Sequence, residues 1–202
     1  MSQIFQRLEL EAFRAGITPR TRESRDWFRG KVATMRSGNI NRNQLMREKE
    51  LSLQAPRYTR DLIGRMFMFF YDPKTKDTLP FYDRFPLIVM VGPAAGGFYG
   101  LNLHYLPPIL RAKMLDGLMD ITNNRAYDDT TKFRIRYETL KRMSKLRYYE
   151  PCFKHYLTAH VKGRFARVEA PEWEIAAFLP TAQWKKSTAQ NVYKDSRMKV
   201  LT

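Results

Sequence analysis

Apolar residues recur at helical spacing along the first quarter of the chain. The pattern covers residues 2–15 and stops at Gly16. Charged residues surround a thin apolar stripe over 21–36, which predicts a second helix, and a third is predicted over 42–53. Because such narrow faces bury little surface alone, we expect residues 1–60 to form a basic helical arm that lies on the body or is mobile or bound to a partner.

The middle of the chain changes to strand patterns. Aromatic and β-branched runs occupy residues 66–71, 79–82, 87–91 and 98–103. The glycine-rich stretch GPAAGGFYG at 92–100 precedes a strand-like run and lacks the Lys-Ser/Thr pair of a nucleotide loop, so it indicates a turn with close backbone approach. Together these runs predict a small antiparallel sheet of about four strands, SH3-like or a meander.

Helical spacing returns after Pro107. Four further helices are predicted over residues 108–121, 129–147, 151–165 and 171–179. Pro180 then ends the ordered pattern, and residues 183–202 are expected to form a basic C-terminal tail. The expected fold class is therefore α+β, with one core domain over 61–182 in which a helical layer follows the antiparallel sheet.

Charge narrows the range of partners. The 202 residues include 36 Lys and Arg against 20 Asp and Glu, which gives a formal net charge of +16. Residues 1–60 and 110–202 hold this excess, whereas 61–109 are neutral. A chain this basic favours polyanions or acidic proteins as partners. The apolar runs are far shorter than the roughly 20 residues of a membrane helix, so we expect no signal peptide and no membrane partner.

Two clusters of cations are the candidate contact sites for nucleic acid or a protein partner. Each cluster contains aromatic residues, and cations that neutralise phosphates beside rings that stack on bases are typical of nucleic-acid interfaces. The alternative is that the cations form a solvated helix face. The first cluster comprises Arg20, Arg22, Arg25, Arg29 and Lys31, and the second comprises Arg134, Arg136, Lys141, Arg142, Lys145 and Arg147.

The sequence gives weaker evidence for a catalytic site or a metal site than for a basic contact surface. Cys152 is the one cysteine, so no internal disulfide forms, and its spacing to His155 and His160 on a predicted helix does not bring all three together. His104 is expected to be structural. Four carboxylates are candidates for a magnesium-dependent nuclease site, namely Asp72, Asp77, Asp83 and Glu138. Asp72 and Asp77 are better explained as residues of a turn. We therefore expect no enzyme, metal, cofactor or small-molecule substrate.

Several sequence stretches resemble a family of small basic proteins of large contractile-tailed bacteriophages. They are FYDPKTKDTLPFYDRFPL at 70–87, GGFYGLNLHYLPPILRAKMLDGL at 96–118, KHYL at 154–157 and FLP at 178–180. The likeness covers about residues 65–182. It implies a virion or assembly protein of the DNA-end-protector, head-completion, neck or baseplate type, and it supplies no catalytic residues.

The leading hypothesis is a non-enzymatic structural or assembly component of a tailed-phage virion. It would dock by its basic surfaces to neighbouring proteins of the baseplate, tail or neck, with DNA as a further candidate partner. The alternative is a DNA-end-binding protector or packaging-associated protein with nuclease-like chemistry. The resemblance also implies a location in the virion, and in the host cytoplasm during assembly.

Overall fold

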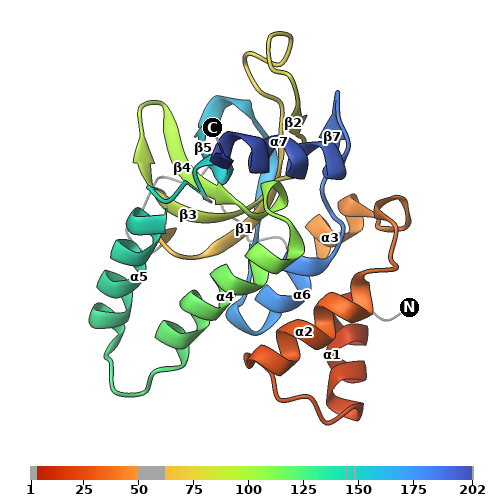
Figure 1. The fold of residues 1–202 in the computed structure, drawn as a ribbon, viewed down its shortest axis with the longest axis vertical. Coiled ribbons are helices and arrows are strands. Elements are labelled where there is room, and N and C mark those ends of the chain that lie inside the picture. The colour runs from red at the N-terminus through yellow and green to blue at the C-terminus, as the bar shows by residue number, and fades with distance from the viewer. Residues whose placement is uncertain (1–3, 50–61, 144, 148, 202) are drawn as a thin grey trace.

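The chain folds as an α+β protein in which helices cover a curled antiparallel sheet (Figure 1). The computed structural model describes residues 4–49, 62–143, 145–147 and 149–201. The sheet order is β5-β4-β3-β1-β6, and β2 pairs with β7 in a second, two-stranded sheet. The strands are β1 (Met66–Tyr71), β2 (Tyr82–Asp83), β3 (Leu87–Ala94), β4 (Gly97–Asn102), β5 (Phe153–Leu157), β6 (Val161–Val168) and β7 (Trp184–Lys185).

Helices come from both ends of the described chain and from the segment after β4. Figure 1 shows α2, α4 and α6 together below the sheet, with α7 on the upper side of that view beside β2 and β7. Within the described residues, no helix is long and apolar enough to cross a membrane. The helices are α1 (Ile4–Arg14), α2 (Arg22–Val32), α3 (Arg42–Lys49), α4 (Pro108–Asn123), α5 (Asp129–Met143), α6 (Trp173–Phe178) and α7 (Ala189–Leu201), with short 3-10 turns that include η3 (Leu103–Tyr105), η4 (Glu150–Cys152) and η5 (Thr158–His160).

Both faces of the sheet are buried, and they bury different groups. Along β1, Met66 and Met68 face the helices, whereas Phe67 and Phe69 belong to an aromatic-rich cluster whose buried members lie on strands. The ring centroids of Phe98 on β4 and Phe165 on β6 are 5.6 Å apart, although two strands lie between β4 and β6 in the sheet order. The sheet must therefore curl strongly, which brings β4 and β6 together at this aromatic cluster.

The α+β class is confirmed, but the prediction of an SH3-like or meander sheet of about four strands is wrong, because the main sheet has five strands in the order β5-β4-β3-β1-β6. Residues 151–165 were predicted to form a helix, because apolar residues there recur at intervals of four; they form η4, β5, η5 and the start of β6 instead. Gly163, at φ +83, adopts a conformation that a helix excludes. The predicted strand at 79–82 is reduced to β2, which pairs with β7 outside the main sheet.

The glycine-rich hairpin between β3 and β4 confirms the predicted turn. Gly96 has φ +68, the left-handed conformation that glycine tolerates best. A Cβ on Gly97 would lie 1.8 Å from the carbonyl oxygen of Tyr156 on β5. Glycine at this position therefore allows β5 to pair with β4.

The N-terminal helices share the main hydrophobic core. Phe5, Leu8, Phe28 and Leu45 are buried in the same cluster as the helix-facing side of the sheet. The expectation that residues 1–60 are mobile or held by a partner is thus wrong for α1, α2 and α3, which lie on the body. The boundary at residue 60 falls outside the described residues and stays a prediction.

The C-terminal segment is also ordered. Residues 183–202 were expected to form a tail after Pro180, but they contain β7 and α7, and Val192 is fully buried. The polar composition of this segment concealed Val192, an apolar position by which α7 packs on the body. The structure of Thr202 lies outside the described residues.

A buried carboxylate fixes α2 against α6, so its removal should destabilise the fold. Glu174 accepts hydrogen bonds from the backbone N–H of Arg20 and from the hydroxyl of Ser24, and its Oε1 lies 3.5 Å from Nη1 of Arg25. Glu174→Ala leaves a buried guanidinium less compensated, and we expect it to lower the free energy of unfolding by about 3 kcal/mol. Urea unfolding measures this change.

The matched control is Glu9→Ala, which removes an exposed carboxylate from α1. We expect it to change the free energy of unfolding by no more than about 0.5 kcal/mol. Equal effects of the two substitutions would show that the Glu174 contacts do not hold α2 in place.

Candidate functional site

The first predicted cluster contains one residue that cannot contact a partner. Arg25 is 3% exposed and lies between two intramolecular carboxylates, those of Asp116 on α4 and Glu174 on α6. Its guanidinium therefore joins three helices, and including it among the contact residues was wrong. A buried cation of this kind contributes to the net charge of the chain without contributing to the charge of its surface.

The other residues of this cluster lie at the surface with acidic neighbours. Arg29 Nη2 is 3.0 Å from Asp26 Oδ1, and Lys31 Nζ is 2.6 Å from Glu11 Oε2. Arg20 and Arg22 are exposed at the start of α2. Nearby carboxylates thus offset part of the positive charge that the sequence places here.

The residues of the second predicted cluster lie along α5 and in the turn after it. Arg136 is half-buried, with its Nε donating to the carbonyl of Lys132, and burial lowers its pKa. Arg142 Nη2 lies 3.9 Å from Glu138 Oε2 in an exposed pair, which is worth little in water. Lys145 and Arg147 lie beyond the end of α5. Solvent-exposed members of the cluster are Arg134, Lys141, Arg142, Lys145 and Arg147.

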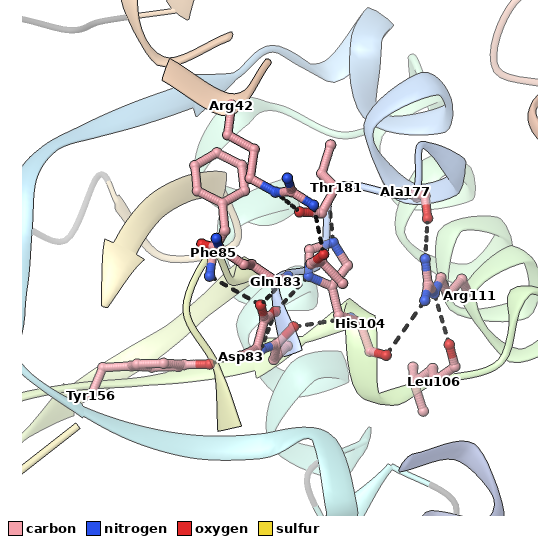
Figure 2. A network of polar contacts seen from close by, with 12 residues as sticks. Arg42, Asp83, Phe85, His104, Leu106, Arg111, Tyr156, Ala177, Thr181 and Gln183 are labelled. Carbon is pink, nitrogen blue, oxygen red and sulfur yellow. Dashed lines mark hydrogen bonds and ion pairs between the residues drawn. The ribbon is translucent and has the colours of Figure 1, made fainter. Parts of the chain in front are cut away.

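A buried polar network lies at the centre of the fold (Figure 2). Asp83 on β2 accepts hydrogen bonds through Oδ1 from the backbone N–H groups of Phe85 and Gln183, at 3.0 and 2.8 Å. Its Oδ2 lies 2.6 Å from Nδ1 of His104, and Nε2 of the same ring lies 3.1 Å from Oγ1 of Thr181. Three segments far apart in the sequence therefore meet at one carboxylate.

The protonation state of this network follows from its burial and its partners. Burial lowers the pKa of His104 despite the neighbouring Asp83 carboxylate, and the positive charges of Arg111 and Arg42 act in the same direction. Burial alone would raise the pKa of Asp83, but His104 and two backbone N–H groups outweigh it and lower that pKa. A neutral imidazole thus donates from Nδ1 to an ionised carboxylate, and Thr181 donates to Nε2.

An Asp, a His and a Thr joined in this order have the connectivity of a hydrolase triad, but their burial argues for a structural role. Asp83, His104 and Thr181 are 4%, 0% and 1% exposed, so a substrate cannot reach the hydroxyl. The structural role expected for His104 is supported by this geometry.

Of the four carboxylates considered for nuclease chemistry, Asp72 and Asp77 line one small cavity, but the other two do not join them in a metal-binding group. Asp72 pairs with Lys76 at 3.1 Å, Asp83 is buried, and Glu138 lies on α5. Cys152 and His155, predicted on one helix, lie in η4 and β5. In the part of the chain that the structure describes, no group of three or more His, Cys, Asp or Glu side chains is placed to hold a metal ion.

A concave surface with several cations lies elsewhere, at the 72–82 loop. Two cavities, of about 570 Å³ and about 400 Å³, share Tyr82 as a lining residue. We call them together the loop cleft. Asp72, Asp77 and the buried Asp83 are its acidic lining residues. Its basic lining residues are Lys74, Lys154 and Lys199 in the larger cavity and Lys76, Arg84, Lys162 and Lys186 in the smaller one.

One lysine of the loop cleft fixes the loop itself. Lys186 Nζ donates to the backbone carbonyls of Lys76, Asp77 and Leu79, at 2.8, 2.9 and 3.2 Å. This residue follows β7, so the C-terminal segment holds the loop in place. The loop therefore has a defined shape beside the cations.

Sequence reasoning missed the loop cleft because its cations come from separate parts of the chain. The segment 61–109 is neutral when its charges are counted together, yet the fold adds lysines from β5, β6 and α7 around its loop. The signal that could have found it was the aromatic-rich run FKHYL at 153–157, which is typical of a strand. Recognising that strand would have placed Lys154 beside the sheet.

Comparison with known proteins identifies the family. Basic concave surface on a small α+β body is typical of proteins that bind polyanions. A family model described as phage T4 terminal DNA protecting protein matches residues 11–198. The chain therefore belongs to this phage family, and the match includes helices α2 and α3, which the sequence resemblance did not cover. No curated protein and no solved structure matches the chain.

The buried imidazole predicts a dependence of stability on pH. Because the pKa of His104 is lowered in the fold, the unfolded chain takes up a proton first as the pH falls below the ordinary value of about 6.5. Stability should then fall by up to about 1.4 kcal/mol per pH unit until the folded ring is protonated. Urea unfolding between pH 7.5 and 5.0 measures this slope.

His104→Asn retains an amide donor toward Asp83 but does not titrate. We expect this variant to be less stable at pH 7.5 and to lose most of the slope between pH 6.5 and 5.0. His155→Gln, which changes an exposed ring on β5, should keep the slope. An unchanged slope in His104→Asn would contradict the assignment of a neutral, buried imidazole.

Proposed function

We propose that this protein binds the ends of linear duplex DNA in a bacteriophage and shields them without chemistry of its own. The family match over residues 11–198 carries this proposal, because the family is described by terminal DNA protection. Protection of an end requires only that a bound protein occupies the space an exonuclease needs. The protein then needs a surface that binds DNA tightly and at its end, and it needs no catalytic group.

The surface charge supports binding to DNA. Arg25, Arg42 and Arg111 have intramolecular partners, but most of the cations behind the net charge of +16 are solvent-exposed. Each cation that neutralises a phosphate releases condensed counterions, which favours binding at low salt. The loop cleft and the second predicted cluster, along α5 and the turn after it, are the two surfaces that we propose for this contact.

The family match favours end protection over the role of a docking component of the baseplate, tail or neck. Docking to other virion proteins stays a prediction, as do the locations in the virion and in the host cytoplasm during assembly. The positions of Asp72, Asp83 and Glu138 support the non-enzymatic part of the proposal, since they do not form one carboxylate cluster.

The proposal is tested with one DNA sequence in two forms, a linear duplex and a relaxed closed circle. At 150 mM salt we expect the protein to bind the linear form at least tenfold more tightly, because only that form has ends. Log affinity for either form should fall linearly with log salt, with a slope of about −0.9 per neutralised phosphate. Equal affinity for the two forms would contradict end recognition.

A triple variant separates general phosphate contacts from the preference for ends. Arg134→Ala, Lys141→Ala and Lys145→Ala together should flatten the salt slope by about 0.9 for each phosphate that the variant no longer neutralises. The control, Arg14→Ala, Arg36→Ala and Arg47→Ala, removes the same charge from exposed positions among the N-terminal helices. Identical slopes for both triple variants and the wild type would show that the face of α5 does not touch DNA.

A further inference from the structure

The larger cavity of the loop cleft has walls from three parts of the fold. Its volume is about 570 Å³, within the range of about 300–1,000 Å³ that small-molecule sites occupy. The 72–82 loop forms one wall, β5 forms the second, and α7 contributes Ser196 and Lys199 to the third. Lys186 holds the loop, and α7 is held on the body by the buried Val192 and by a hydrogen bond from Arg111 Nη2 to the Tyr193 hydroxyl at 2.6 Å, so both walls have defined positions.

Lys154 of β5 gives this cavity an uncompensated positive charge. Its ammonium is half-buried and lies 4.2 Å from the ring centroid of Tyr105. Among the described residues, no carboxylate forms an ion pair with it. Burial and then the charge of Lys199 lower the pKa of Lys154 to about 8, so the ammonium remains largely charged at neutral pH.

A bound anion would neutralise the positive charge of Lys154 in this cavity. A bound phosphate would supply the missing counter-charge to Lys154, and two exposed lysines that line the same cavity, Lys74 and Lys199, would add to the attraction. The buried carboxylate of Asp83 also lines the cavity, but its oxygens are occupied by hydrogen bonds from His104 and backbone N–H groups. The net charge presented to a ligand is positive.

The cavity also offers aromatic surface beside this charge. Phe81 and Tyr82 are half-buried and line it, and Phe81 contacts the rings of Tyr105 and Trp184, with centroids 6.0 Å away in both cases. These contacts hold the Phe81 ring in a fixed orientation. An aromatic ring beside a phosphate site is the combination that binds a nucleotide, because a base stacks on the ring while its phosphate meets the cation.

The volume of the cavity limits which part of a DNA molecule can enter it. A space of about 570 Å³ holds a ligand of small-molecule size, so a continuous duplex does not fit into it. A single unpaired nucleotide does fit. Only the end of a duplex, where the last base pair can open, presents such a nucleotide together with a terminal phosphate.

We propose that the cavity between the 72–82 loop, β5 and α7 receives the terminal nucleotide of a DNA strand, with Lys154 at its phosphate and Phe81 and Tyr82 beside its base. This inference rests on the proposed function and adds how an end is distinguished from internal duplex. Two exposed cations of the smaller cavity, Arg84 and Lys162, would then hold the adjoining backbone.

The test uses a 5′-phosphorylated DNA hairpin with one open blunt end and a dumbbell of the same duplex closed at both ends. Lys154→Met removes the charge and keeps an unbranched chain of similar length. We expect the wild type to prefer the open hairpin by at least tenfold and Lys154→Met to reduce that preference about tenfold, which equals about 1.4 kcal/mol. Affinity for the dumbbell should stay within twofold of the wild type.

Two further variants guard against misfolding and general charge effects. Lys199→Met changes an exposed residue of the same cavity and should also lower the preference for the open end, by a smaller factor. Lys113→Met removes an exposed charge from α4 and should leave the preference unchanged. The wild type should further bind a 5′-phosphorylated open hairpin more tightly than a 5′-hydroxyl one.

The outcomes separate this inference from the proposed function. If Lys154→Met and Lys199→Met both keep the wild-type preference, or weaken binding to hairpin and dumbbell equally, the cavity does not receive the end. The proposed function would stand in that case, because the wild type would still prefer an open end. If the wild type itself binds hairpin and dumbbell equally, the proposed function fails.

Discussion

The ionised carboxylate of Asp83 is the contact on which the arrangement of the candidate site depends. It accepts hydrogen bonds from the backbone of residues 85 and 183 and from His104, so it joins β2, η3 and the segment that leads into β7. A buried charge is stable only with such a set of donors. The 72–82 loop precedes Asp83 directly, and α7 follows β7. One buried anion therefore positions two walls of the larger cavity.

Three arginines have a structural task in this protein. Arg25 joins α2 to α4 and α6, Arg42 donates to the carbonyls of residues 181 and 182, and Arg111 donates to Leu106 and Ala177. The planar guanidinium suits these buried positions, because it satisfies several acceptors at once. Lysine, by contrast, supplies six of the seven cations of the loop cleft. The formal charge of +16 thus combines structural cations with those available to a partner.

Local pattern predicted the elements whose packing agrees with it. The strands at 66–71, 87–91 and 98–103 and the helix at 108–121 form where expected, since both their residue types and their neighbours favour those conformations. The segment 151–165 did not follow its helical spacing, because pairing with β4 and β1 decides its structure and depends on residues distant in sequence. The same dependence concealed the loop cleft, where Lys154 of β5, Lys162 of β6 and Lys199 of α7 join the cations of the 72–82 loop. The net charge of a sequence segment therefore does not show how many charged residues from other segments lie beside it in the folded protein.

The central claim is that this protein occupies the ends of linear DNA, and exonuclease digestion tests it most directly. A linear duplex with one restriction site at its centre is incubated with the protein and then treated either with an exonuclease or with the restriction enzyme. End protection predicts that exonuclease digestion slows strongly while cleavage at the central site keeps its rate. Equal slowing of both reactions, or of neither, would contradict the account.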